Sequence, residues 1–327
     1  MQTEYRSWRV FEEAGNVQCR QVKRPLDELR KAGGVLVRGV YSGVNFKDAL
    51  TALNRAKIVR RFPCIVGIEL VGIVEQSDDP RFSPGDPVIA HGFGMGAEGN
   101  GGFTEWLSLP ADQLVRIPNG LTLEEAGVIG VAGYTAALAI DAMQVNGLTL
   151  ERGPVAVNGA TGGVATLAID MLAGAGYEVH AISRKPDDGL LRDLGAREIH
   201  LPPETGKRPL ETARWAGAVD SLGGAALDEL LRTMRQDGIV AAFGNAMGNG
   251  LDTSVLPFIL RGVRLLGINA NSPMPLRERI WGRIASDLKP QRTSRIARYV
   301  GLDDLEQVFQ TLIEGQGRGR FIVDLRR

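Results

Sequence analysis

The feature that most constrains the fold of this chain is the segment VAVNGATGGVATLAI, which spans residues 155–169. One apolar run leads into a group of small residues and a second apolar run leads out, which predicts a strand, a tight turn and a helix. Gly159 and Gly162 suit the turn, and Gly163 lacks the Cβ that would keep a phosphate group away from the backbone. Ala165 is small where the helix would pack against a sheet.

In that setting, the first turn of the helix is a predicted binding site for the pyrophosphate of a dinucleotide. The free N–H groups at a helix N-terminus carry about half a positive charge, which attracts phosphates. The sequence GATGGVA departs from the usual G-x-G-x-x-G motif. The alternative to a dinucleotide site is a tight turn that binds no ligand. The residues expected to contact the cofactor here are Thr161, Gly162, Gly163, Val164 and Ala165.

Strands and helices alternate on both sides of this turn. Thr122 and Glu125 have the spacing of a capping box, which predicts a helix from residue 123. Short apolar strands then alternate with helical stretches, including a helix over residues 225–238. This order predicts a doubly wound parallel sheet built from right-handed crossovers.

The part before residue 122 follows a different pattern. Short runs rich in Val, Ile and Leu, such as GGVLVRGVYS and ELVGIVEQS, are bounded by turn residues and predict a β-rich domain. The strand-like GRFIVDL near residue 320 resumes that character. We therefore predict an α/β chain with a β-rich domain over residues 1–127, a nucleotide-binding domain over 128–260, and a return to the first domain over 261–327.

The second strand of the nucleotide-binding domain indicates which dinucleotide is bound. Proteins that bind NAD usually place an acidic residue about 20 residues after the glycines, where it holds the ribose hydroxyls. Here the strand EVHAIS ends in Ser183, Arg184 and Lys185, which offer a hydroxyl and two positive charges to a 2′-phosphate. This pattern favours NADPH over NADH, and an ordinary solvated Arg-Lys pair is the alternative.

Composition excludes several other classes. Lys plus Arg and Asp plus Glu number 38 each, so nothing favours binding to nucleic acid or to an anionic membrane surface. The longest uncharged run, residues 126–140, is shorter than the roughly 20 residues of a spanning helix and is predicted to be buried core. Two cysteines and three histidines show no metal-ligand spacing, so no metal is expected, and the cysteine content suits the cytoplasm.

Several further stretches resemble the medium-chain dehydrogenase/reductase superfamily, and within it the zinc-free quinone oxidoreductase branch that includes acrylyl-CoA reductases. They extend from about residue 40 to the C-terminus: NFKDAL, KIVRRFPCIVGIELVGIV, DPRFSPGDPVIAHGFGMGAEGNGGFTEW, IGVAGYTA, GATGGVA, LPFILRGVRLLGIN and GRGRF. The resemblance implies a GroES-like β-rich catalytic domain and a Rossmann domain. It also implies NADPH as the hydride donor and a homodimer.

The resemblance also implies a reaction that needs no zinc. Zinc alcohol dehydrogenases of the superfamily have a Cys ligand where this chain has Asn45, and Gly-His-Glu where it has Gly67, Ile68 and Glu69. Without a Lewis acid, reduction of a conjugated double bond is easier than reduction of a simple ketone, because the charge spreads onto a carbonyl oxygen. The expected small-molecule substrates are an enoyl-CoA thioester, with acrylyl-CoA to propionyl-CoA preferred, or an enone or a quinone.

The superfamily pattern assigns further residues to the site. The catalytic candidates are Asn45, Lys47 and Tyr134, and the additional cofactor contacts are Phe46, Asn245, Ile259 and Ala270. For Lys47 a helix-start ion pair with Asp48 is the alternative, and for Tyr134 it is a packed helix aromatic. Two alternative functions remain: a general quinone or enone reductase, and an NADPH-binding protein with little catalytic activity.

Overall fold

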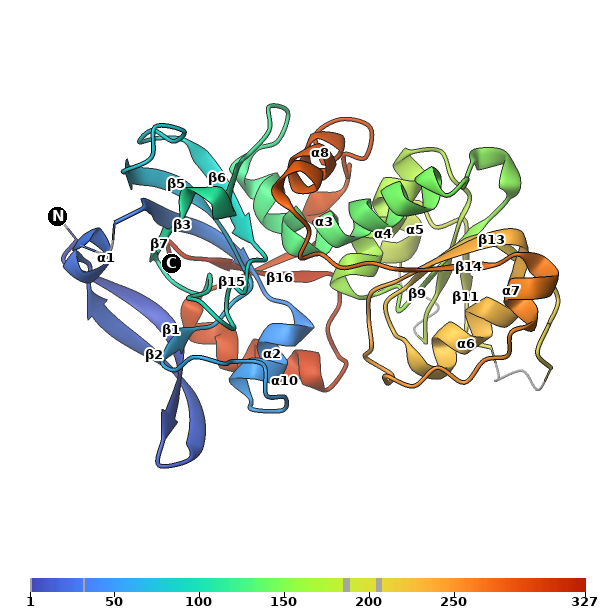
Figure 1. Ribbon diagram of the computed structural model, residues 1–327, viewed down its shortest axis with the longest axis horizontal. Helices are drawn as coiled ribbons and strands as arrows, with labels where there is room; N and C mark the ends of the chain where they lie inside the picture. Colours follow the sequence, from blue (N-terminus) through green and yellow to red (C-terminus); the bar gives the residue numbers. More distant parts are fainter. Residues whose placement is uncertain (1, 32, 185–188, 204–207) are drawn as a thin grey trace. The chain divides into compact units, whose positions relative to one another are not determined.

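The computed structural model describes residues 2–31, 33–184, 189–203 and 208–327, and the chain divides into two compact units (Figure 1). The β-rich unit consists of Met1–Val131, Asn271–Trp281 and Ala297–Arg327. The Rossmann-type unit consists of Ala132–Ala270 and Gly282–Ile296.

The Rossmann-type unit is built on a parallel sheet with the strand order β11-β10-β9-β12-β13-β14. Helix α4 covers one face, whereas α6 and α7 lie on the other, as a doubly wound sheet requires (Figure 1). The strands are β9 (Val155–Asn158), β10 (Val179–Ile182), β11 (Glu198–His200), β12 (Trp215–Asp220), β13 (Met234–Ala242) and β14 (Arg264–Gly267). The helices are α4 (Gly163–Gly174), α5 (Leu190–Asp193), α6 (Gly224–Thr233), α7 (Leu256–Arg261) and α9 (Thr293–Ile296).

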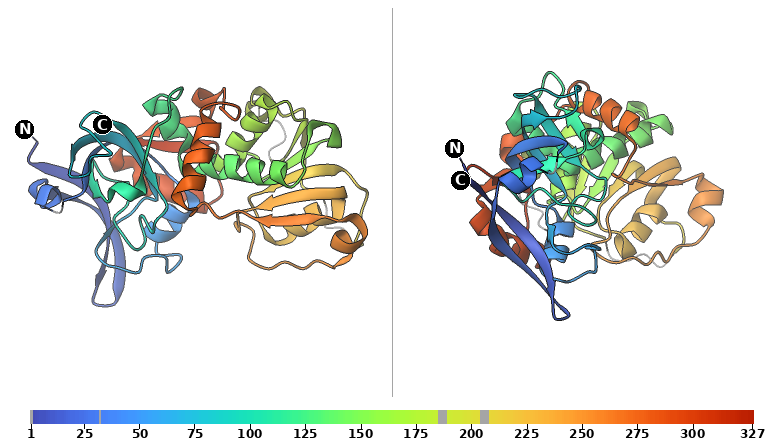
Figure 2. Two further views of the ribbon diagram at one scale, coloured as in Figure 1. Left: turned by 45° about the horizontal axis from the view of Figure 1, so that its top comes forward. Right: turned by 60° about the vertical axis from the view of Figure 1, so that its left-hand side comes forward.

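The β-rich unit contains a sheet of seven strands in the order β15-β16-β3-β5-β6-β8, with β7 paired to β3, and a smaller sheet β2-β1-β4. Its strands β1 and β2 form a long hairpin (Figure 2). The bounds are β1 (Glu4–Glu13), β2 (Asn16–Pro25), β3 (Val35–Gly43), β4 (Cys64–Ile65), β5 (Glu69–Ser77), β6 (Pro87–His91), β7 (Trp106–Leu109), β8 (Leu114–Arg116), β15 (Ala297–Val300) and β16 (Arg320–Asp324). Helices α1 (Asp27–Lys31), α2 (Phe46–Ala52) and α10 (Leu305–Ile313) complete the unit, with α2 packed on α10.

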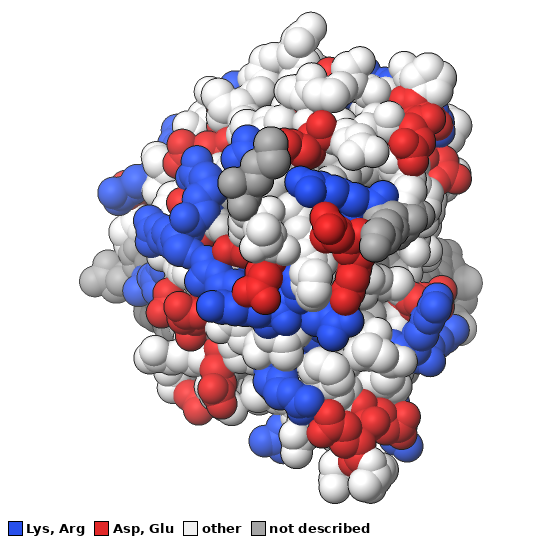
Figure 3. All heavy atoms as spheres, turned by 90° about the vertical axis from the view of Figure 1, so that its left-hand side faces the viewer, with Lys and Arg blue, Asp and Glu red and all other residues white. Residues whose placement is uncertain are grey.

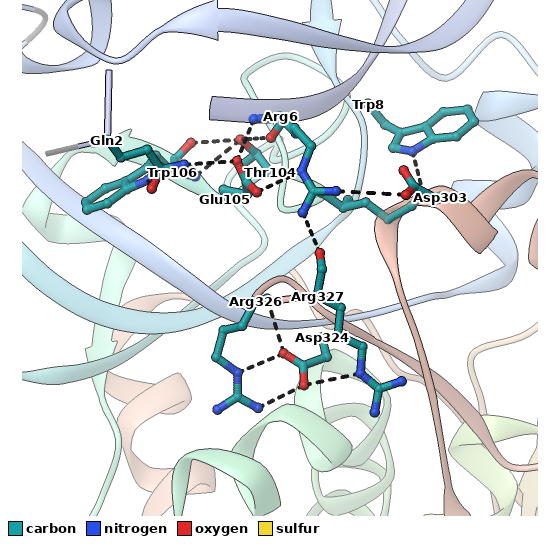
Figure 4. A network of polar contacts seen from close by, with 11 residues as sticks. Gln2, Arg6, Trp8, Thr104, Glu105, Trp106, Asp303, Asp324, Arg326 and Arg327 are labelled. Carbon is teal, nitrogen blue, oxygen red and sulfur yellow. Dashed lines mark hydrogen bonds and ion pairs between the residues drawn. The ribbon is translucent and has the colours of Figure 1, made fainter. Parts of the chain in front are cut away.

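Polar contacts join the start of the β-rich unit to its last segment (Figure 4). Arg6 on β1 pairs with Glu105 Oε1 through Nε at 2.8 Å and lies 3.9 Å from Asp303 Oδ2. Its Nη2 also donates to the carbonyl oxygen of Arg327. The indole Nε1 of Trp8 donates to the carbonyl oxygen of Leu302 at 2.8 Å. These bonds help to explain why the last segment, Ala297–Arg327, belongs to the same unit as the first segment of the chain.

Helices α3 (Leu123–Val145) and α8 (Met274–Ile284) contain residues of both units. The predicted capping box begins α3: Thr122 N donates to Glu125 Oε2 at 2.8 Å, and Glu125 N donates to Thr122 Oγ1 at 3.1 Å. Although α3 is long and apolar enough to cross a membrane, 94% of its most apolar window is buried within the fold. The expectation of a core helix over residues 126–140 is therefore confirmed.

The predicted domain boundaries differ from the observed division after residue 260. Residues 261–270 belong to the Rossmann-type unit because β14 pairs with β13. Residues 282–296 return to that unit, where Arg283 pairs with Asp141 at 2.9 Å and Arg292 with the fully buried Asp170 at 3.0 Å. On the face that Figure 3 shows, basic and acidic side chains are interspersed, in keeping with their equal numbers.

Candidate active site

The glycine-rich turn lies between β9 and α4, as the sequence predicts. Gly159 has φ = +58°, a conformation that residues with a side chain rarely adopt. A Cβ at this position would lie 2.3 Å from the hydroxyl oxygen of Ser221. Gly162 is the N-cap of α4, and its N–H donates to the carbonyl oxygen of Gly159 at 2.8 Å. The turn therefore depends on glycine for its backbone conformation and for space.

A buried amide holds the turn against the neighbouring strand. Asn158 Nδ2 donates to Asp220 Oδ1 at 2.5 Å, and Asn158 Oδ1 accepts from the backbone N–H of Ser221 at 2.8 Å. Asp220 also accepts the N–H of Gly223 at 3.0 Å. Burial raises the pKa of Asp220, and the bond from Asn158 opposes that shift. These bonds join the ends of β9 and β12, a brace that the sequence analysis did not identify.

The first turn of α4 presents its main-chain N–H groups at the point where the strand order reverses. Thr161, Gly162, Gly163 and Val164 are partly exposed, whereas Ala165 is 1% exposed where α4 packs on the sheet. The first N–H groups of a helix have no acceptor within the helix. Because β10 and β12 lie on either side of β9, the turn stands at the carboxyl edge where doubly wound sheets bind ligands. This geometry suits a pyrophosphate.

The end of β10 provides the next predicted contact. Ser183 is 6% exposed, and its N–H donates to the carbonyl oxygen of His200 at 2.9 Å. Arg184 is exposed to solvent beside it. Lys185, the third predicted residue, lies outside the described residues. Ala160 N, in the glycine turn, donates to the carbonyl oxygen of Ile182 at 3.3 Å, so the turn and the end of β10 are neighbours.

The remaining predicted cofactor contacts are placed differently. Asn245 and Ala270 follow β13 and β14, so both lie beyond the carboxyl ends of parallel strands. Asn245 is exposed, and its Nδ2 donates to Asn249 Oδ1 at 2.7 Å. Ile259 is 68% exposed on α7. The last residue of α7, Arg261, donates to the carbonyl oxygen of Met234 at the start of β13, so the structure does not bring Ile259 together with the glycine turn.

In the β-rich unit, the predicted catalytic segment begins α2. The backbone N–H of Asn45 donates to Asp48 Oδ2 at 2.8 Å, which fixes the first turn of the helix. Phe46 is 39% exposed and Lys47 is exposed. Asp48 is buried, and this burial raises the pKa of its carboxyl group to about 7, against the lowering effect of the Asn45 bond. The alternative for Lys47, an ion pair with Asp48, is not among the salt bridges of the described residues; Asp48 instead caps its own helix.

A fully buried ion pair lies directly behind Asn45. Arg320 Nη2 lies 2.5 Å from Glu69 Oε1, and the two side chains are 1% and 2% exposed. Glu69 also accepts the backbone N–H of Gly43 at 2.9 Å and that of Val131 at 2.6 Å. A Cβ on Gly43 would lie 1.7 Å from Arg320 Nη2, so the pair requires glycine at that position. Both oxygens of the Glu69 carboxylate are thus occupied.

The guanidinium of Arg320 also orients Asn45. Its Nη1 donates to Asn45 Oδ1 at 3.3 Å, and Asn45 Nδ2 donates to the carbonyl oxygen of Gly43 at 3.2 Å. The amide is therefore held with its oxygen toward the cation. The sequence analysis quoted GRGRF without assigning a role to Arg320, and no local spacing could have done so, because 275 positions separate it from Asn45.

The catalytic candidate Tyr134 and the histidine His91 both lie in buried settings. Tyr134 is fully buried on α3, and its catalytic role stays a prediction. His91 is 1% exposed, and burial together with Arg277 holds its pKa well below the usual range. Trp281 Nε1 donates to His91 Nε2 at 3.0 Å. A neutral, buried imidazole of this kind holds α8 to β6 and has no proton to give near neutral pH.

Known proteins share this architecture. The profile of the alcohol dehydrogenase GroES-like domain matches residues 31–119. The chain is 42% identical to the acrylyl-CoA reductase AcuI of Ruegeria pomeroyi over 319 residues, 96% of each protein. The crystal structure of the yhdH oxidoreductase of Salmonella enterica in complex with NADP is similar with a TM-score of 0.93 and 37% identity, covering 98% of this chain and 99% of that one. Bacillus subtilis yhfP, solved with NAD bound, has a TM-score of 0.93 and 39% identity, covering 99% and 100%.

A GroES-like unit joined to a Rossmann-type unit defines a two-domain dehydrogenase or reductase. Because these relatives are 37–42% identical to the chain over almost its whole length, the chain belongs to the medium-chain dehydrogenase/reductase family and is an oxidoreductase. The predicted fold class is confirmed, and the predicted nicotinamide dinucleotide agrees with the cofactors bound in these relatives.

Proposed function

We propose that this chain reduces an activated carbon–carbon double bond with NADPH, that the preferred substrate is the enoyl thioester acrylyl-CoA, and that no zinc takes part. The observation that carries the proposal is the buried Arg320–Glu69 pair behind Asn45. Zinc dehydrogenases have a cysteine ligand in place of Asn45, and here the Glu69 carboxylate is satisfied by a guanidinium and two N–H groups. The identity to an acrylyl-CoA reductase supports the substrate.

The residues of the β-rich unit suit this chemistry. NADPH, when bound, supplies a hydride for the β-carbon of the substrate. Negative charge then develops on the carbonyl oxygen, and such an enolate needs hydrogen-bond donors and a proton. Lys47 is exposed and carries three donor hydrogens, while the Asn45 amide is held in one orientation by Arg320. Phe46 presents an exposed ring that can pack against a cofactor or substrate.

The preference for NADPH over NADH rests on the end of β10. Ser183 and Arg184 stand where a dinucleotide at the glycine turn would place its adenosine ribose. A 2′-phosphate accepts charge-assisted hydrogen bonds from an arginine. Residues 182–184 are Ile-Ser-Arg, so they include no acidic residue of the kind that holds the ribose hydroxyls of NAD. Lys185 adds a second positive charge to the sequence at this point.

The decisive experiment is the initial rate of NADPH oxidation by the chelator-treated protein with acrylyl-CoA and, separately, with 9,10-phenanthrenequinone. We expect turnover on acrylyl-CoA with NADPH and weak turnover with NADH. Turnover on the quinone alone would favour the second candidate, a quinone reductase, which the name of the YhfP relative supports. Saturable NADPH binding without turnover on either acceptor would replace both with a binding protein. Loss of activity on chelation, in a protein that circular dichroism shows to be still folded, would contradict the zinc-free mechanism.

We further propose a homodimer in the cytoplasm. Strand β14 is the edge of its sheet, and α7 with its N-cap residue Val255 exposes apolar side chains: Val255 is 64%, Ile259 68% and Leu260 59% exposed. An open strand edge flanked by apolar residues favours pairing with a second copy. Sedimentation of the wild type against Ile259→Glu tests this: a dimer should become a monomer. The two cysteines are both free thiols, as suits a reducing compartment.

A further inference from the structure

Two adjacent strands at the edge of the parallel sheet carry the same short pattern. Residues 178–180 read Glu-Val-His and residues 198–200 read Glu-Ile-His. Since alternate residues of a strand share a face, each histidine lies on the same side as the glutamate two positions before it. Strands β10 and β11 pair in parallel with His180 opposite Glu198. The register therefore gathers two imidazoles and two carboxylates on one face.

The side chains converge at close range. His180 Nδ1 lies 2.9 Å from His200 Nε2, and Glu198 Oε2 lies 3.7 Å from the first nitrogen and 3.4 Å from the second. Bond lengths of about 2.0–2.2 Å in tetrahedral zinc sites put two ligand atoms about 3.3 Å apart. The three measured separations bracket that value. We propose that His180, His200 and Glu198 bind one Zn²⁺ or a similar divalent ion, with the fourth position open to water.

A neighbouring carboxylate indicates which nitrogen of His180 would bind the metal. His180 Nε2 lies 2.9 Å from Glu178 Oε1. A carboxylate on the outer nitrogen fixes the tautomer, so Nδ1 is the atom that faces the metal, and it also makes the ring a better ligand. His180 is 7% exposed and stacks against His200, and both rings meet the edge of Trp215. The ligands are therefore held before any ion arrives.

Charge and access also suit a cation. The side chain of Glu198 is 56% exposed and that of His200 is 23% exposed, so the site opens to solvent. Glu178 and Glu198 together offset Arg214, which stacks on Trp215, and Arg197, which pairs with Glu178.

This site is separate from the residues assigned to catalysis. All of its ligands lie in the Rossmann-type unit, whereas Asn45, Glu69 and Arg320 belong to the β-rich unit. The bound ion would join the edge strand β11 to β10. Its nearest link to the proposed cofactor site is the main chain of His200, whose carbonyl oxygen accepts the N–H of Ser183.

The test uses the tag-free, full-length chain after treatment with a chelator. Zn²⁺ is titrated by calorimetry, and Co²⁺ serves as a visible-absorption probe of the coordination geometry. We expect one ion per chain, the strong absorption of four-coordinate Co²⁺, and a melting temperature that rises with Zn²⁺ concentration. Labelled histidine side chains give a direct view: Zn²⁺ should shift His180 Nδ1 and His200 Nε2 and leave the buried His91 unchanged.

Variants separate ligands from neighbours. His200→Asn should abolish the four-coordinate Co²⁺ spectrum, and Glu198→Gln should weaken Zn²⁺ binding at least 10-fold, since each removes one ligand. Glu178→Ala should weaken it about 10- to 100-fold by releasing the orientation of His180. Glu306→Gln, an exposed carboxylate on α10, should change nothing. Failure of the wild type to bind Zn²⁺, or unchanged affinity in Glu198→Gln and His200→Asn proteins that melt normally without metal, would reduce the cluster to a hydrogen-bonded histidine pair.

Discussion

The glycine turn and the Asn45 cluster serve their sites in opposite ways. The turn is made by consecutive residues, 158–165, and works through its main chain: a positive φ at Gly159 and the open N–H groups of α4. The cluster is made by side chains from three distant segments, namely Asn45, Glu69 and Arg320. A site built from the backbone of one segment can be recognised as a motif in the sequence. A site built from side chains that are far apart in the sequence forms only when the chain folds.

The largest effect is expected from breaking the cluster. Arg320→Met leaves the Glu69 carboxylate buried without its cation, and we expect the free energy of unfolding to fall by about 3–5 kcal/mol. Urea denaturation followed by circular dichroism measures the change. The double variant Glu69→Gln/Arg320→Met removes the stranded charge and should recover much of the loss. A double variant as unstable as Arg320→Met would show that the guanidinium acts through packing and not through the ion pair.

The next effect comes from the turn. In Gly159→Ala the new side chain must adopt φ near +58°, which costs about 1–2 kcal/mol, and it also meets Ser221. We expect a lower melting temperature and an NADPH dissociation constant raised about 10-fold, because the phosphate cradle shifts. Gly174→Ala is the matched control: Gly174 ends α4 with open space around it, and this change should cost nothing. If the two variants had the same melting temperature and the same NADPH dissociation constant, Gly159 would not be required for the turn or for cofactor binding.

A smaller effect is expected at the end of β10. Arg184→Ala should raise the KM for NADPH about 10-fold, or about 1.4 kcal/mol, and leave the KM for NADH unchanged, because the 2′-phosphate alone loses a partner. Steady-state kinetics with both cofactors measure the ratio. Arg192→Ala, another exposed arginine just beyond this segment, should leave both constants as they are. A parallel rise for both cofactors would mean that Arg184 does not select between them.

An effect of a different kind is a slope with pH. The Asp48 carboxyl has a pKa of about 7 in the folded protein, above its ordinary value of 3.8. Between these values the folded state holds a proton that the unfolded state has lost, so this group makes stability fall as pH rises from about 4 to about 7. The limiting slope is about 1.4 kcal/mol per pH unit. Asp48→Asn should remove that contribution, and Asp112→Asn, an exposed aspartate, should retain it. Denaturation at several pH values compares the slopes.

Much of the Rossmann-type unit could be predicted because its signals are short-range. The glycine run marked the passage from β9 to α4. In the β-rich unit, the Thr122–Glu125 spacing likewise marked the start of α3. One element was wrong: the helix predicted over residues 225–238 ends at Thr233. Met234 already belongs to β13, where it pairs with Trp215, and that tertiary pairing overrides the local helical pattern.

Other contacts depend on how the strands align in the folded protein. The histidines at positions 180 and 200 show no metal-ligand spacing along the chain, yet parallel pairing of β10 and β11 brings their nitrogens to 2.9 Å. The repeated Glu-x-His was the available signal, and only the alignment of two strands gives it meaning. Arg320 offered no signal of this kind, because its partners are set by the order of strands in the β-rich sheet.

That order has a consequence for the growing chain on the ribosome. Strand β16 lies inside the large sheet of the β-rich unit, between β15 and β3, and it carries Arg320. Residues of the Rossmann-type unit end at Ile296, so all its segments emerge earlier, although its partner unit began first. Until β16 is translated, the end of β3 (residues 41–43) lacks its partner on one side, and Glu69 lacks the cation that pairs with it in the folded protein. The first unit to start is the last to finish, and for that interval its open strand is the part most in need of a chaperone's protection.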